Sequence, residues 1–185
     1  MHESASPSAL EELPGELLIW VLIVSELLVF GAGLVIFMAA RLADPSGFAD
    51  AQNELHRTGA ALNTVVLVTS GYLAARALSL RKAARRGAAR LALVSAAFLG
   101  IVFLVIKGAE YADKAAQGIS YETHTFYTFY YLLTGFHSAH VVAGIVILLL
   151  IAWYDAPRNI EAGAAFWHMV DLVWVLLFPV IYLMA

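Results

Sequence analysis

Five long apolar stretches constrain this chain more than any other feature of its sequence. Each is close to the roughly 20 residues that an α-helix needs to cross the hydrocarbon core of a bilayer. Strand-period alternation is missing, and the stretches are too long for the strands of a membrane β-barrel. They cover about residues 17–40, 59–80, 91–111, 126–153 and 164–185. The sequence therefore predicts an all-α integral membrane bundle of five transmembrane helices, a single domain over residues 1–185.

The composition agrees with a membrane protein and narrows the chemistry. Hydrophobic residues make up 62% of the chain and charged residues 14%, which is more apolar than a soluble domain. The chain has no cysteine, so a disulfide, an iron–sulfur cluster and a thiolate-bound metal are excluded. Redox chemistry would therefore have to use histidines. No glycine-rich nucleotide loop is present, and no nucleic-acid partner is expected.

Basic residues gather in the link between the second and third apolar stretches. Because lysine and arginine mark cytoplasmic links, this link is expected in the cytoplasm. Alternation of the spans then places the N-terminus in the cytoplasm and the C-terminus outside. The first sixteen residues carry no lysine or arginine, so they lack the basic region of a signal peptide, and the first helix is expected to be retained. The basic residues are Arg76, Arg81, Lys82, Arg85, Arg86 and Arg90.

Three polar residues lie deep within the predicted helices. With a rise of about 1.5 Å per residue, Glu26 lies roughly 15 Å from the cytoplasmic surface, and His137 and His140 lie roughly 16 to 21 Å from the outer surface. Residues three apart share a helix face. Both histidines are therefore expected to point into the bundle, where Glu26 contacts one of them. Glu26 is either a protonated structural group or a proton-handling group; the histidines either pack or bind a metal or haem.

A second polar pair is predicted on the fifth helix. His168 and Asp171 also lie three residues apart. An ionised aspartate beside an imidazolium forms a locally neutral pair, which lowers the cost of burial. We expect this pair to dock the helix against a neighbour. The alternative is that His168 is a haem ligand, although it lies only a few residues from the cytoplasmic end of the predicted helix.

A ladder of charged residues lies near the outer end of the third helix. Lys107, Glu110 and Lys114 are spaced at i, i+3 and i+7, and the last two have the favourable i, i+4 spacing of an ion pair. We expect a solvated or headgroup-level outer ion network. The aromatic residues of 126–131 are interpreted as an interfacial belt, and Trp167 and Trp174 as interfacial or lipid contacts.

Five motifs, each on its own predicted helix, resemble one family. They are SELLVFGAG (25–33), LNTVVLVTSGY (62–72), FLVIKGAEY (103–111), TGFHSAHVVAG (134–144) and FWHMVDLVW (166–174). Their order resembles that of subunit III of haem-copper oxidases, from about Pro14 to Ala185. The resemblance matches Glu26 to the family's buried carbodiimide-reactive glutamate, Glu110 to its helix-end glutamate, His137 and His140 to its paired histidines, and His168 and Asp171 to its WHxVDxVW motif.

Departures from the family pattern suggest a subtype. The long members have seven helices, and this chain lacks the first two, which form one arm of a lipid-holding cleft. Ser138 stands where the family usually has a glycine. Short links, the lysine of KGAEY and the stretch TFYTFYYLLTGFHSAH look most like the five-helix subunit-III-like proteins that accompany bacterial nitric oxide reductases. Five-helix subunits III of cytochrome oxidases are similar too.

The resemblance implies a non-catalytic accessory subunit in a bacterial cytoplasmic membrane. Such a subunit binds no haem or copper itself, packs against a catalytic haem-copper subunit that does, and supports its assembly, stability and proton uptake. Bound phospholipid is a further expected ligand. Two alternatives stay open. One is an autonomous b-type haem protein that uses His137 or His140 with His168, and the other is a proton or substrate transporter built on Glu26.

Overall fold

The computed structural model describes residues 17–154 and 156–184, and over these residues the chain is helical. The N-terminal sixteen residues, on which the signal-peptide prediction rests, lie outside the described part. Five helices are long and apolar enough to cross a membrane. These agree with the five predicted spans, and the protein is a multi-pass membrane protein. The helices are α1 (Leu17–Ala43), α2 (Pro45–Asn53), α3 (Arg57–Lys82), α4 (Arg86–Ala116), α5 (Thr125–Tyr154) and α6 (Pro157–Phe178), followed by a π-helical turn, η1 (Pro179–Leu183).

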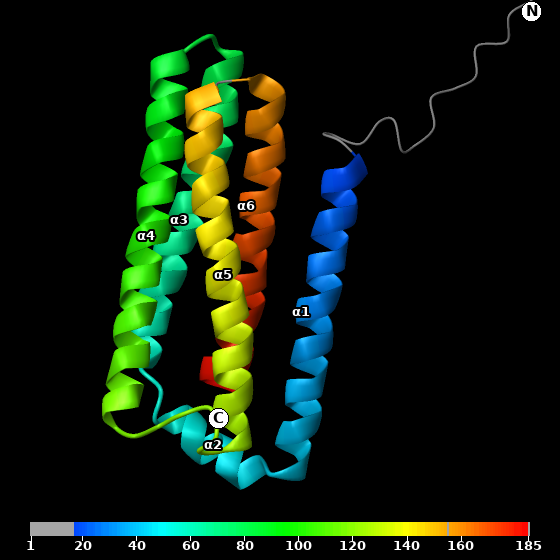
Figure 1. Ribbon diagram of the computed structural model, residues 1–185, viewed down its shortest axis with the longest axis vertical. Helices are drawn as coiled ribbons and strands as arrows, with labels where there is room; N and C mark the ends of the chain where they lie inside the picture. The colour runs from blue at the N-terminus through cyan, green and yellow to red at the C-terminus, as the bar shows by residue number, and fades with distance from the viewer. Residues whose placement is uncertain (1–16, 155, 185) are drawn as a thin grey trace, which may run out of the picture.

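Four of the long helices form an antiparallel bundle, and α1 lies at its edge (Figure 1). In the bundle α3 packs on α4 and α6, and α5 packs on the other sides of α4 and α6. The first helix, α1, contacts α5 and α6. Most of its large apolar side chains remain exposed, so α1 buries less of its apolar surface than the other spans do.

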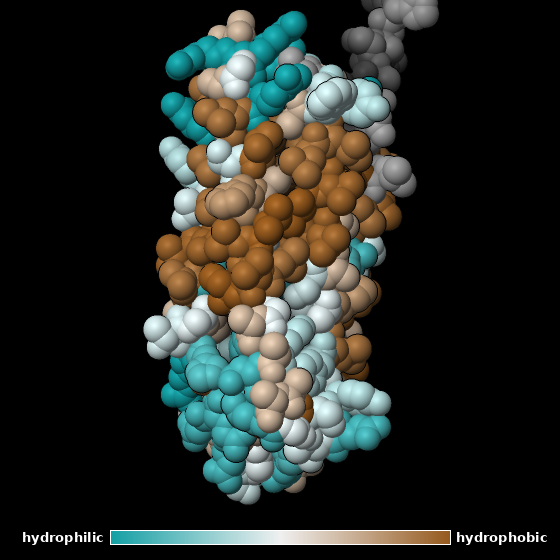
Figure 2. All heavy atoms as spheres, turned by 60° about the vertical axis from the view of Figure 1, so that its left-hand side comes forward, coloured by the Kyte–Doolittle hydropathy of each residue, from teal (hydrophilic) through white to brown (hydrophobic). Residues whose placement is uncertain are grey.

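The links and short helices are divided between the two ends of the bundle. The start of α1, the α3–α4 link and the α5–α6 link lie at one end, while α2, the α4–α5 link and η1 lie at the other (Figure 1). Figure 2 shows an apolar belt between two polar ends on one face of the molecule. This alternation is the one that the predicted topology requires. Which end faces the cytoplasm stays a prediction.

The short helix α2 was not predicted and closes one end of the bundle. Its start carries a helix signal, because Asp44 accepts a hydrogen bond from Gly47 N (3.1 Å) and Pro45 occupies the first turn, where its missing N–H is not needed. Sequence analysis indicated only a link here. The Gly47 amide, followed by His124, lowers the pKa of Asp44 below its ordinary value of 3.8.

The last helix begins earlier than predicted and ends in an irregular turn. It starts at Pro157 rather than near residue 164. His168 therefore lies eleven residues after the start of the helix, whereas the prediction placed it only a few residues after the start. At the other end Pro179 has no N–H to donate and the backbone becomes π-helical. The buried Gln52 of α2 donates to two carbonyls of this turn, Val180 O (2.9 Å) and Ile181 O (2.8 Å).

Two expectations about aromatic residues are wrong. Trp167 and Trp174 are 0% and 1% exposed, so they are core residues rather than lipid contacts. Phe126 of the predicted belt is also buried, because α2 covers this end of α5, with the Phe48 ring centroid 5.7 Å from that of Phe126. Sequence spacing could not predict this cover, because α2 itself was not predicted.

Candidate functional site

Glu26 and His140 meet between α1 and α5. Glu26 Oε2 lies 3.1 Å from His140 Nε2, and the side chains are 20% and 15% exposed. The expected contact between the glutamate and one histidine is therefore present. Among the described residues, Glu26 Oε2 has no aligned hydrogen-bond partner, so charge pairing with the imidazole is its main compensation. The other ring nitrogen, His140 Nδ1, lies 2.9 Å from Phe136 O and can donate to it.

This geometry determines what the pair can do chemically. A proton on Nδ1, held by the Phe136 carbonyl, leaves Nε2 facing Glu26 as the site where a second proton can be gained or lost. One proton can therefore lie on the carboxylate or on the imidazole. The first arrangement is a neutral pair and the second an ion pair, and both keep the net charge of the pair at zero in the membrane.

His137 does not share this environment. It is 0% exposed and lies between the Trp174 ring, at 5.3 Å and nearly parallel, and the Phe103 ring, at 5.5 Å. Neither of its ring nitrogens has a hydrogen-bond partner among the described residues. His137 thus points into the bundle, as expected, and His140 is the histidine of the pair that contacts Glu26.

The charged ladder of α4 is buried rather than solvated. Lys107 is 1% exposed, and its Nζ lies 3.0 Å from Glu110 Oε2 and 3.0 Å from Tyr130 OH. Tyr182 accepts a third hydrogen bond from Lys107 and donates to Glu110 Oε1 (3.0 Å). The ammonium also lies 4.4 Å from the centre of the Tyr130 ring. We call Lys107, Glu110, Tyr130 and Tyr182 the Lys107 cluster.

The predicted Glu110–Lys114 ion pair is absent from this cluster. Lys114 is also 1% exposed, and it donates to Glu54 O (2.7 Å) and more weakly to Gln117 (3.4 Å). The expectation of a solvated network failed because α2 and η1 cover this end of α4. Tyr182 and Tyr130 were not identified as polar partners, since tyrosines in an apolar stretch give no signal until the helices are packed.

His168 and Asp171 lie where α6 packs on α3. His168 Nδ1 is 3.7 Å from Asp171 Oδ2, and Asp171 lies directly against Gly71 of α3, where a Cβ would overlap its carboxylate. This position agrees with the expected docking role. Two tryptophans of α6 add hydrogen bonds to α3 that were not predicted: Trp167 donates to Ser70 (3.0 Å) and Trp174 to Thr64 (3.0 Å). The hydroxyl groups in the motif LNTVVLVTSGY (62–72) were the sequence feature from which these hydrogen bonds could have been predicted.

The polar residues of the described chain are dispersed rather than clustered. No group of three or more histidine, aspartate or glutamate side chains is placed to hold a metal ion within residues 17–154 and 156–184. His137 lies in the core, whereas His168 lies on the α3–α6 surface with a side chain that is 47% exposed. In the haem alternative that pairs His137 with His168, the two ligands would thus have different environments.

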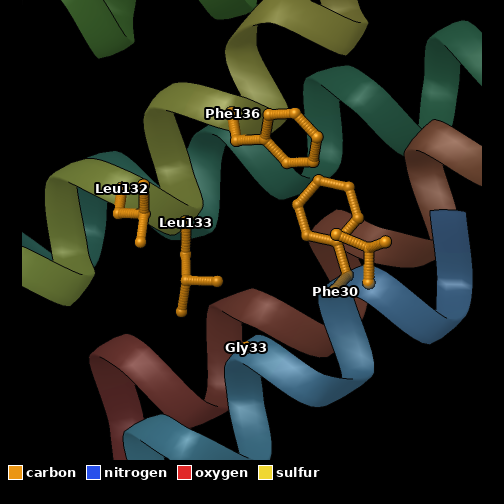
Figure 3. Close-up of a pocket in the computed structure, with 6 residues that line it drawn as sticks. Phe30, Gly33, Leu132, Leu133 and Phe136 are labelled. Atoms are coloured by element: carbon orange, nitrogen blue, oxygen red, sulfur yellow. The ribbon is translucent and has the colours of Figure 1, made fainter.

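An apolar hollow of about 270 Å³ lies between α1 and α5 (Figure 3). Gly33 lies in its wall, where Leu133 Cδ2 would be only 2.6 Å from an added Cβ. Gly33 and Leu133 are therefore a point of close contact between α1 and α5. The wall is formed by Val29, Phe30, Gly33, Leu132, Leu133 and Phe136.

Known proteins similar to this chain fall in one family. The family model described as cytochrome c oxidase subunit III matches residues 16–185. Cytochrome c oxidase subunit 3 of Thermostichus vulcanus is 28% identical over 178 residues, which cover 89% of this chain and 84% of the relative. The probable cytochrome c oxidase subunit 3 of Mycobacterium tuberculosis is 27% identical over 169 residues, 85% of this chain and 82% of the relative.

A longer relative matches over a shorter region. Cytochrome c oxidase subunit 3 of Pyricularia grisea is 35% identical over 129 residues, and these cover 65% of this chain but only 47% of the relative. Together with the family match over residues 16–185, these likenesses agree with the five ordered motifs. The chain belongs to the cytochrome c oxidase subunit III family.

Proposed function

We propose that this chain is a non-catalytic accessory subunit of a respiratory haem-copper oxidoreductase in a bacterial cytoplasmic membrane. The family match over residues 16–185 carries the proposal. The packing supports it, because the polar groups singled out in the spans contact neighbouring helices and do not gather around one reaction centre. In this proposal haem and copper belong to the catalytic partner, and the chain stabilises that partner.

The Glu26–His140 pair is the part of the chain best suited to affect proton uptake by the partner. It links α1 to α5 through a carboxylate and an imidazole that lie 3.1 Å apart, and it can hold a proton on either residue without a change in net charge. We propose that this exchange tunes a hydrogen-bonded network beside the partner's proton route. The family's buried glutamate, to which Glu26 is matched, supports the choice of this pair.

Replacement of the glutamate tests this role. Glu26→Gln keeps the shape of the side chain but removes its acidity, so the complex should assemble normally while its turnover slows or its working lifetime shortens. Ser25→Ala is the matched control, because Ser25 is exposed and its hydroxyl donates to the carbonyl of Leu22 in its own helix. Unchanged turnover and lifetime in Glu26→Gln would reduce Glu26 to a packing residue.

The substrate of the partner divides the proposal into two versions. The lysine of KGAEY and the short links favour a bacterial nitric oxide reductase and a role in denitrification, whereas the relatives named above are cytochrome c oxidase subunits. Turnover of the purified complex with nitric oxide and with oxygen distinguishes the versions. Reduction of nitric oxide alone supports the reductase version, and reduction of oxygen alone supports the oxidase version.

The two rival functions make different predictions. A b-type haem protein would show a Soret band in the chain purified without a partner. A transporter would move protons or substrate across vesicles that contain only this chain. Either result would contradict the accessory role.

Lipid is proposed as a ligand of the apolar hollow between α1 and α5, because its wall is built from apolar side chains and Gly33.

A further inference from the structure

One surface of the bundle exposes polar side chains at membrane depth. His168 lies eleven residues from the start of α6 and Tyr72 ten residues from the end of α3. With about 1.5 Å per residue, both lie roughly 15 Å from the same end of the bundle. The His168 side chain is 47% exposed, and Tyr72 is 64% exposed.

These two side chains have unused hydrogen-bonding groups. The Nδ1 atom of His168 faces Asp171, at 3.7 Å from its Oδ2, so Nε2 points away from that carboxylate. In the described part of the chain, neither this nitrogen nor the Tyr72 hydroxyl has a partner. Asp171 Oδ1 is buried there without a hydrogen bond as well. Lipid tails could satisfy none of these groups.

The surface around them has the residue pattern of a helix-packing surface. His168, Leu172 and Val175 form an exposed stripe on α6 at i, i+4 and i+7, which is one face of a helix. On α3 the exposed residues Val68 and Ala75 lie one turn before and after Gly71, the glycine that α6 approaches most closely. Small residues at such a surface let another helix come close.

We infer that this α3–α6 face, centred on His168 and Tyr72, is the docking surface for a transmembrane helix of a partner subunit. The partner helix carries a polar side chain that hydrogen-bonds to His168 Nε2 at this depth. Hydrogen-bonding complementarity selects a protein helix rather than lipid, because intramembrane imidazoles pair with polar groups. The identity of the partner as the catalytic subunit rests on the proposed accessory function, but the position of the surface does not.

Spin labels on single cysteines test the surface directly, since the chain has no cysteine of its own. Labels are placed at Val68 and Leu172 on the proposed surface, and at Val35 and Val146 on α1 and α5 as controls. All four positions are exposed in the chain. In the purified complex, we expect oxygen collision rates to fall several-fold at Val68 and Leu172 relative to the chain alone, and to stay unchanged at the controls.

Three outcomes would overturn the inference. Equal oxygen access at all four positions in the complex would show that lipid covers the surface. Shielding of Val35 and Val146 alone would place the partner on the α1–α5 side and leave the accessory role intact. Spin–spin broadening between labels at Val68 or Leu172 would identify the occupant as a second copy of this chain.

A pair of variants tests the polar contact itself. His168→Leu should reduce the recovery of the chain with its complex several-fold, whereas His168→Gln should retain most of it, because the amide can still hydrogen-bond. Circular dichroism verifies that both variants fold. Equal recovery of the two variants would contradict a hydrogen bond from the partner to His168.

Discussion

Glu26 of α1 and His140 of α5 bring a carboxylate oxygen and an imidazole nitrogen to 3.1 Å in a part of the chain that crosses the membrane. The pair joins α1, the described membrane span with the smallest buried share, to the bundle. A polar contact between two side chains therefore links α1 to α5 within the membrane-spanning part of the chain.

Removal of either partner should weaken the attachment of α1. Glu26→Leu or His140→Leu alone leaves the other group unpaired, at a cost of about 1–3 kcal/mol in the free energy of unfolding. The double variant should lose less than the sum of the two single variants, because no unpaired group remains. Unfolding of the purified chain in mixed detergent micelles measures all three. Strict additivity would show that the two side chains do not interact.

Loss of the lysine should be more damaging in the Lys107 cluster. Lys107→Met leaves Glu110 buried without its cation, and breaking a buried pair in this way costs about 3–5 kcal/mol. Lys107→Met combined with Glu110→Gln should recover much of that loss. Lys82→Met at the exposed end of α3 is the control and should change the unfolding free energy little. An equal effect of the two lysine variants would contradict the burial of Lys107.

A methyl group at Gly71 should separate α3 from α6. Its Cβ would overlap the Asp171 carboxylate, and such overpacking costs about 1–3 kcal/mol. Gly108→Ala is the matched control, since nothing lies within 4 Å of its Cβ position in α4, and alanine favours a helix by about 1 kcal/mol over glycine. Thermal unfolding of the two variants should therefore shift in opposite directions. A stabilised Gly71→Ala chain would refute the close contact.

Acid should loosen α2. The pKa of Asp44 is lowered in the folded chain, chiefly by the Gly47 amide, so its contribution to stability is present above the ordinary value of 3.8 and is lost as the pH falls through the lower folded value. A spin label on a cysteine at the exposed Asp50 should become more mobile below this value. Asp44→Asn should remove this pH dependence, and a transition that persists in the variant would assign it to another group.

The sequence predicts the spans and one polar contact well, for a physical reason. Apolar length alone identifies membrane helices, and depth counting placed Glu26 and His140 at the same level. Depth counting did not predict that Lys107 is buried, because Tyr182, which covers it, lies 75 residues further along the chain. The helix α2 was also missed, because its nine residues contain no long apolar run and look like a link until Phe48 is seen to pack on Phe37 at 5.4 Å.

The start of the last helix shows a different limit. The most apolar residues of this helix begin near residue 164, where its start was predicted. Pro157 in the first turn is a known sequence signal for a helix N-terminus and indicates the earlier start. That error moved His168 toward the membrane surface. With the observed start, His168 lies eleven residues into the helix, and this position is the basis of the proposed α3–α6 docking surface.

Affinity purification of the tagged chain in mild detergent, with mass spectrometry of the proteins that co-purify, tests the accessory role most directly. We expect a large haem-copper catalytic subunit in stoichiometric amount, with the haem spectrum belonging to that subunit. Recovery of the chain alone, in the same detergent that preserves its fold, would contradict the accessory role and favour the haem-protein or transporter alternative.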